Sequence, residues 1–407
     1  MKRIVFLGAI ASVILVVLWQ RPQVEAATVQ APRFEVDPMW PKPLPNHWVI
    51  GAALGVAVDS RDHVWIVHSP AALEVKEQYA TMTPKASSCC AAAPPVLEFN
   101  AEGDLVGHWG GEGTGYAWPS RNHGIDADYK GNIWIGGNGV GKQPAVVAHN
   151  EDRTAVGPVH DSMLLKFTQS GRLLMQVGQP NKSKGSNDIE NVRLPAKSIV
   201  DPKTNELYVA DGYGNRRVIV FDADTGKYKR HWGAYGSKPD DTQLPAYDPS
   251  VAPAKQFRTP VHCVALANDG LLYVCDRTND RIQVFKTDGS FVKEIFIEKN
   301  TLGDGSVFDI ALSKDPGQKY IYVADGSNMK VHVLQRDTLE ALTSFGDGGR
   351  QPGQFYAVHS IATDSKGNIY TTETYRGQRL QKFHFRGIAA VAKKDQGVVW
   401  PKASPTR

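Results

Sequence analysis

Residues 262–285, HCVALANDGLLYVCDRTNDRIQVF, decide the fold of this chain. The segment contains three short apolar strands separated by two polar turns, which begin at Asn268 and Asp276. Gly, Asn and Asp tolerate the positive φ angles that tight turns between antiparallel strands require. Short apolar runs bounded by such turns are typical of antiparallel strands. The segment therefore predicts a small antiparallel sheet.

The same pattern recurs along most of the chain. Its six copies begin at Leu54, His123, Ala196, His262, Phe308 and His359. The last three starting points are 46 and 51 residues apart, close to the roughly 40–50 residues of one propeller blade. No segment of helix length keeps a period of 3.6 residues, and radially arranged sheets close into a ring that protects their edges. We therefore expect an all-β fold, a six-bladed β-propeller over residues 51–390.

Loops and aromatic residues punctuate these copies. Polar loops rich in Ala, Gly and Pro lengthen the earlier copies at 70–95, 138–161 and 234–256. Insertions of this kind map to one face of a propeller, often the binding face. An aromatic residue followed by Gly ends three copies, at Trp109, Trp232 and Phe345. We expect these aromatic rings to pack between neighbouring sheets.

The segments outside the repeats have separate roles. Residues 27–50 include the strand-like run 33–37, which we expect to form an outer strand of the sixth blade and to close the ring. Residues 391–407 are expected to form a C-terminal tail.

Residues 1–26 have the pattern of a secretory signal peptide. Lys2 and Arg3 precede an uncharged apolar run over residues 4–19, and small residues at 24 and 26 suit a cleavage site. A retained membrane anchor is the alternative, but a run of 16 residues is shorter than the roughly 20 needed to cross a bilayer. The pattern predicts a secreted or periplasmic protein.

Charge and composition exclude several classes of partner. The formal net charge is +4, and it falls to +2 once the expected signal peptide is removed. A nearly neutral chain lacks the basic surface that nucleic acids or anionic membranes attract. We expect a monomer that binds a small-molecule or peptide substrate, with no nucleic acid and no stable membrane insertion after cleavage.

The four cysteines do not suggest a disulfide framework for a chain of this size. Cys89 and Cys90 are adjacent, which leaves open a vicinal disulfide, a soft-metal site and an unpaired pair of loop cysteines. Cys263 and Cys275 flank a short turn, where export would permit a bridge without demanding one.

The residue that opens each copy alternates between histidine and apolar side chains. His123, His262 and His359 open copies two, four and six. Alternate blades of a six-fold ring are related by a three-fold rotation, so the three imidazoles should converge near the axis. Zinc accepts three histidines with a fourth position open. The slot therefore predicts one zinc ion, with a hydrogen-bonded ring of histidines as the alternative.

Polar and charged side chains occur at two further places in the repeats: directly after the slot residue and at the ends of the second strands. Lys197 and Asp309 each come directly after the slot residue, as channel polar groups or an ion pair. Tyr213 and Arg277 end second strands near the expected channel mouth. A phenol beside a metal can act as a base, and a guanidinium can bind a carboxylate through two hydrogen bonds. Loop packing for Tyr213 and an ion pair between Asp276 and Arg277 are the alternatives.

Two phrases, YVADGYGNRRVIVF from Tyr208 and YVCDRTNDRIQVF from Tyr273, resemble the blade signature of the NHL-repeat family over roughly residues 50–390. Together with the histidine slot, they resemble the peptidyl-α-hydroxyglycine α-amidating lyases. That resemblance implies zinc on His123, His262 and His359, with Tyr213 as base and Arg277 in the active site. It also implies a carbon–nitrogen lyase that splits a C-terminal α-hydroxyglycine into a peptide amide and glyoxylate.

The chain departs from that family at three positions. The family's other active-site arginine falls at Ser69, its methionine before the third ligand at Ala357, and its calcium-binding carboxylate at Ser360. These differences weaken the case for the family's substrate and argue against its calcium ion.

Two other functions remain open. One is a non-enzymatic propeller that binds a protein or glycan partner on its loop face. The other is a different metal-dependent lyase or hydrolase, for example a lactone-opening enzyme, whose acidic metal ligands the histidine slot does not match.

Overall fold

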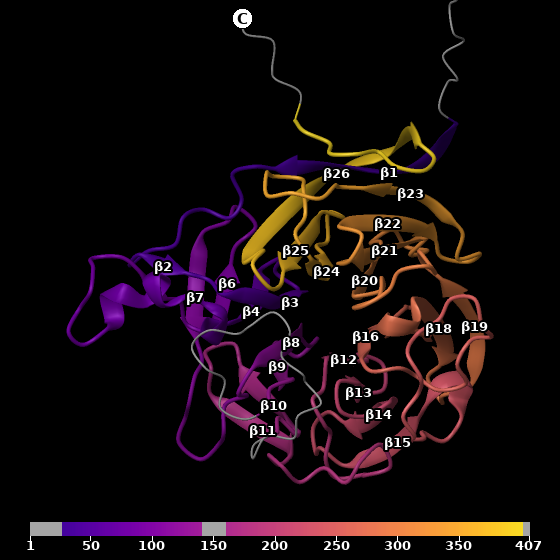
Figure 1. Ribbon diagram of the computed structural model, residues 1–407, viewed down its shortest axis with the longest axis horizontal. Helices are drawn as coiled ribbons and strands as arrows, with labels where there is room; N and C mark the ends of the chain where they lie inside the picture. The colour runs from indigo at the N-terminus through magenta and orange to yellow at the C-terminus, as the bar shows by residue number, and fades with distance from the viewer. Residues whose placement is uncertain (1–26, 141–159, 402–407) are drawn as a thin grey trace, which may run out of the picture.

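The computed structural model describes residues 27–140 and 160–401. Within them, six four-stranded antiparallel sheets stand around a central channel, as Figure 1 shows. The six-bladed β-propeller expected from the repeats is therefore confirmed. The expected signal peptide at 1–26 lies outside the described residues.

The first three blades each contain four strands, named here from the channel outward. Blade one contains β3 (Ala52–Val58), β4 (Val64–Ser69), β6 (Val96–Phe99) and β7 (Leu105–Trp109). Blade two contains β8 (Asn122–Ala127), β9 (Asn132–Gly137), β10 (Met163–Thr168) and β11 (Leu173–Gly178). Blade three contains β12 (Lys197–Val200), β13 (Glu206–Asp211), β14 (Arg217–Asp222) and β15 (Tyr228–Trp232).

The last three blades continue the ring. Blade four contains β16 (Val261–Leu266), β17 (Leu271–Asp276), β18 (Arg281–Lys286) and β19 (Phe291–Phe296). Blade five contains β20 (Asp309–Leu312), β21 (Tyr320–Asp325), β22 (Lys330–Gln335) and β23 (Ala341–Phe345). Blade six contains β24 (Val358–Thr363), β25 (Ile369–Glu373), β26 (Arg379–Ala392) and β1 (Thr28–Asp37).

The insertions carry the remaining short elements. A two-residue parallel ladder joins β2 (Trp48–Val49) to β5 (Ala91–Ala92). The 3-10 turns of the described residues are η1 (Pro70–Ala72), η2 (Val75–Thr81), η3 (Ala234–Gly236) and η4 (Arg277–Asn279). No helix in this part of the chain has the length and hydrophobicity needed to span a bilayer.

The ring is closed by the N-terminal segment. Strand β1 pairs antiparallel with β26 along nearly its whole length, and the two lie side by side at the top of Figure 1. Strand β26 continues to Ala392, past the boundary expected at 390. The chain after it returns to the blade, where the Val36 amide donates to the Val399 carbonyl at 3.1 Å.

Aromatic side chains fill the spaces between blades. Trp109 of blade one lies 5.0 Å from Phe167 of blade two, measured between ring centroids. Trp232 of blade three lies 6.0 Å from Phe285 of blade four. Phe345 of blade five likewise lies 5.2 Å from Phe383 of blade six, so the expectation that the blade-ending aromatics pack between sheets is confirmed.

Both cysteine pairs form disulfides in the structure. Cys263 in β16 is bonded to Cys275 in β17, across the hairpin. Cys89 and Cys90 form a vicinal disulfide in the loop inserted into blade one. The alternative of a soft-metal site at Cys89 and Cys90 is therefore wrong.

Two buried ion pairs fasten second strands to third strands. Asp211 contacts Arg217 at 2.8 Å and Asp276 contacts Arg281 at 2.7 Å, and all four side chains are fully buried. Because a charge buried without its partner is costly, Arg281→Met is expected to lower the free energy of unfolding by about 3–5 kcal/mol. Urea denaturation followed by circular dichroism measures this loss.

The exposed pair of Lys42 and Asp104 provides the matched control. Both of its side chains are about half exposed. Lys42→Met is therefore expected to cost less than about 1 kcal/mol. Equal losses in the two variants would contradict a special role for the buried pairs.

Asp126 in β8 makes the stability of the propeller depend on pH. Burial, together with the negative charge of Asp128, raises the pKa of Asp126 to about 7. Its Oδ2 atom has no hydrogen-bond partner among the described residues. A raised folded-state pKa stabilises the protein in acid, and that contribution disappears as the pH rises through about 7.

Asp126→Asn cannot ionise and should escape this loss. The wild-type Tm is therefore expected to fall more than that of the variant between pH 5.5 and pH 8.5. Thermal unfolding at the two pH values measures the difference. Parallel pH profiles for the two proteins would show that Asp126 does not titrate in this range.

Candidate metal centre

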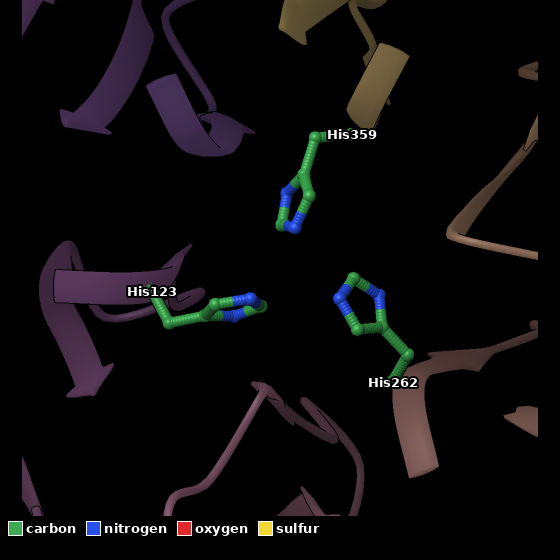
Figure 2. Close-up of side chains that lie close together, drawn as sticks. All are labelled: His123, His262 and His359. Atoms are coloured by element: carbon green, nitrogen blue, oxygen red, sulfur yellow. The ribbon is translucent and has the colours of Figure 1, made fainter. Parts of the chain in front are cut away.

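The three slot histidines meet at the channel axis. They come from the innermost strands β8, β16 and β24 of alternate blades, and their imidazole rings point toward one another in Figure 2. Their ring centroids are 4.8–5.0 Å apart. Only 2–3% of each residue is exposed. The structure therefore confirms that the three histidines predicted from the repeat come together at the channel axis.

Main-chain carbonyls of the other three blades orient these rings. Each Nδ1–H donates to the main-chain oxygen of the slot residue in the next blade: His123 to Ala196 at 2.7 Å, His359 to Leu54 at 2.8 Å, and His262 to Phe308. A carbonyl only accepts, so Nδ1 carries the proton and Nε2 keeps its lone pair. A carbonyl that accepts from the other ring nitrogen fixes the tautomer and the orientation of a metal-binding histidine.

Electrostatics keep His262 and His359 neutral. Burial lowers the pKa of His262 well below its usual value, and the positive charge of Arg277 adds to this effect. Burial likewise lowers the pKa of His359, with further contributions from His123 and Arg277. Neutral imidazole is the form that binds a metal ion.

The donor set fits a single metal ion. The ligand nitrogens of His123, His262 and His359 lie within 4.8 Å of one another. Ligands of a tetrahedral zinc ion at 2.0–2.1 Å are roughly 3.4 Å apart, so a small contraction would suffice. Within the described ranges, no carboxylate or thiol joins this group. The three histidines could hold a metal ion and leave one coordination position open.

Tyr213 and Arg277 lie directly beside the histidines. The Tyr213 hydroxyl is 3.0 Å from His123 Nε2 and 2.8 Å from His262 Nε2. Arg277 Nη1 donates to the Tyr213 oxygen at 3.2 Å. The Arg277 guanidinium also lies over the Phe308 ring, 4.6 Å from its centroid. A phenol, a guanidinium and three imidazoles thus share one small volume.

The alternative of an ion pair between Asp276 and Arg277 is wrong. Asp276 binds Arg281 inside the blade, which leaves Arg277 directed toward Tyr213. At the mouth, Arg277 Nη2 is 3.4 Å from Asp304, whose other oxygen accepts from the Tyr375 hydroxyl at 2.6 Å. Arg277 therefore belongs to the site and not to the blade scaffold.

Arg121 is a residue of the site that sequence reasoning missed. It precedes His123 by two positions and is only 8% exposed. Its positive charge contributes to the lowered pKa of His359. Arg121 lies outside the repeated slots, and its place one pleat before a ligand histidine was the only signal available. Arg121 thus provides a second guanidinium besides that of Arg277. It comes from blade two, whereas the neighbouring blade one has Ser69 at the position of the family's other arginine.

The positions that depart from the lyase family carry no metal-binding group. Ser69 is the buried last residue of β4, and Ala357 has a positive φ of 55° before β24. Ser360 donates its hydroxyl to Asp309 at 2.6 Å. Lys197 contacts both oxygens of that same Asp309 at 2.6 and 2.8 Å, so the ion-pair alternative for these two residues is confirmed.

A second group of metal-binding side chains lies at the edge of blade one. It contains Asp59, His63 and Glu98. The Arg61 guanidinium contacts both carboxylates, at 2.5 Å for Asp59 and 2.7 Å for Glu98. That contact identifies an ion-pair network instead of an ion site.

Comparisons with known proteins agree with the repeat pattern. The NHL repeat model matches residues 261–285, the segment that decides the fold. The chain is 28% identical to peptidyl-glycine alpha-amidating monooxygenase B of Xenopus laevis over 260 residues, 62% of this chain and 25% of that protein. It is 28% identical to the Mus musculus peptidyl-glycine alpha-amidating monooxygenase over 265 residues, 62% of this chain and 22% of that protein. The chain thus spans about a quarter of the length of these relatives.

Two solved lyase structures are similar to this chain at low sequence identity. A streptogramin B lyase structure matches 87% of this chain and 98% of its own, with a TM-score of 0.48 and 13% identity. A catalytically inactive virginiamycin B lyase from Staphylococcus aureus matches 88% of this chain and 89% of its own, with a TM-score of 0.44 and 12% identity.

Proposed function

Because this chain is an NHL-repeat six-bladed β-propeller distantly related to peptidylglycine α-amidating monooxygenase, we propose that it is a metal-dependent carbon–nitrogen lyase. Its substrate is a small carboxylate-bearing or peptide-like molecule that binds at the channel mouth. The single observation that carries the proposal is the position of the Tyr213 hydroxyl, in contact with two metal-binding nitrogens and with Arg277.

Zinc is the metal of this proposal. Three neutral imidazole nitrogens with one open position are the donor set of catalytic zinc. When bound, zinc would polarise a substrate oxygen and lower the pKa of a hydroxyl beside it. The proposal includes export: residues 1–26 would act as a signal peptide that directs the enzyme, as a monomer, to the periplasm or outside the cell.

Tyr213 is the proposed general base. Its oxygen accepts a hydrogen bond from Arg277 Nη1 at 3.2 Å and lies within 3.0 Å of two histidine nitrogens. With an α-hydroxyglycine substrate, Tyr213 would take the hydroxyl proton. The carbon–oxygen double bond of glyoxylate forms as the carbon–nitrogen bond breaks, and the departing nitrogen takes up a proton to give the peptide amide.

Arg277 is the proposed anchor of the substrate carboxylate. Its guanidinium is buried at the mouth and contacts a half-exposed partner, Asp304, at only 3.4 Å. A substrate carboxylate that displaces this weak contact would gain two parallel hydrogen bonds. Arg121, whose positive charge acts on His359, would add positive charge to the site.

The experiment is direct. Zinc-loaded mature protein is incubated with a short peptide ending in α-hydroxyglycine, and glyoxylate release is measured. The same peptide ending in glycine is the control, because it lacks the hydroxyl group that loses the proton. A metal-loaded protein that releases no glyoxylate would reject this reaction.

A further inference from the structure

A polar layer crosses the channel one residue deeper than the histidines. Lys197, Asp309 and Ser360 each follow a slot residue, in blades three, five and six. Lys197 pairs with Ala210 in the β12–β13 ladder, whereas Tyr213 lies three residues beyond Ala210 toward the mouth. The polar layer and Tyr213 therefore lie on opposite sides of the histidine plane.

Asp309 is the centre of this layer. Its Oδ1 accepts from Lys197 Nζ at 2.6 Å and from the Ile310 amide at 2.8 Å. Its Oδ2 accepts from Lys197 at 2.8 Å, from Ser360 at 2.6 Å and from the Ile361 amide at 3.1 Å. Only 3% of the Asp309 side chain and 17% of the Lys197 side chain are exposed.

The layer ties four blades together. The Val56 amide of blade one donates to the Ser360 hydroxyl at 3.3 Å, which adds this blade to the three that hold Lys197, Asp309 and Ser360. The three histidines share with this layer a cavity of only about 10 Å³. That volume is at the lower limit for one water molecule. There is therefore almost no free space for a ligand between the histidines and this layer.

A carboxylate buried on the axis of a ring requires a positive charge, because an unpaired buried charge is strongly destabilising. A divalent cation from solvent or a lysine of the chain can supply it. We propose that Lys197 is the built-in cation of this channel, which makes the propeller independent of a structural divalent ion and seals the side of the metal centre opposite Tyr213. Only the second part of this proposal rests on the proposed function.

Lys197 is thus a positioning residue. By holding Asp309, and through it Ser360, it holds the strand that carries His359 against blade five. A substrate can then reach the metal only from the mouth, where Tyr213 and Arg277 lie.

The test compares Lys197→Met with Lys197→Arg and with the double variant Lys197→Met/Asp309→Asn. The Tm of each full mature protein is measured in metal-depleted buffer with and without millimolar CaCl₂, and bound calcium is counted by elemental analysis. Lys197→Met is expected to have a Tm roughly 5 °C lower, because it leaves Asp309 buried without a counter-charge. Calcium is expected to restore its Tm and to bind at about one equivalent.

The wild type, Lys197→Arg and the double variant are expected to show no calcium response. A wild type that binds calcium and gains Tm would overturn the proposal. So would a Lys197→Met protein that folds with unchanged Tm and ignores calcium. If Lys197→Met does not fold without calcium, the proposal requires calcium to rescue it and the double variant to fold without calcium. Absence of glyoxylate release would reject the proposed lyase and leave these calcium measurements unaffected.

Discussion

Protein purified without chelator is expected to carry about one equivalent of a transition metal, and the His262→Ala variant close to none. The three Nε2 atoms converge on one point, and each ring is locked by a main-chain carbonyl. Loss of an outer partner of a metal ligand costs about 10–100-fold in affinity, and loss of the ligand itself should cost more. Elemental analysis of both proteins measures the difference.

His231→Ala is the matched control. His231 lies in the outer strand β15, hydrogen-bonded to the Tyr228 hydroxyl and far from the slot, so its loss should leave the metal content unchanged. A wild type without metal, and without uptake on titration, would remove the metal centre.

Removal of a slot histidine should leave the fold intact. We expect the free energy of unfolding of the propeller to come mainly from packing between its sheets, with little contribution from the three histidines. His123→Ala is therefore expected to lose metal and to keep its far-ultraviolet circular dichroism spectrum. Global unfolding of His123→Ala at room temperature would show that the metal is structural.

Tyr213→Phe is expected to reduce the turnover number for glyoxylate release by about 10²–10⁴-fold. The variant keeps the ring but removes the hydroxyl that contacts His123, His262 and Arg277. Steady-state kinetics on a peptide ending in α-hydroxyglycine measures the effect. Metal content must be determined on the same sample, because only a metal-loaded variant isolates the loss of the base.

Tyr228→Phe is the control for this prediction. Tyr228 is an exposed tyrosine of β15, and its loss should not change turnover. Unchanged activity in metal-loaded Tyr213→Phe would mean that another group takes the proton, even if the substrate is correct.

Much of the architecture was predictable from local sequence. Turn residues such as Asn268 and Gly270 and the apolar strands around them are local signals, and their repetition predicts both the number of blades and the alternating histidines. A repeat puts equivalent residues at equivalent heights in a ring, so His123, His262 and His359 could be brought together without knowledge of any contact.

Contacts between blades were decided only by the tertiary structure. Arg281 and Arg277 are both close to Asp276 in sequence, and the blade geometry determines that Asp276 binds Arg281. The partners of the ligand histidines and the position of Arg121 depend on which blade follows which around the closed ring. Lys197 and Asp309 are 112 residues apart, and ring closure alone brings their charges to one point on the axis.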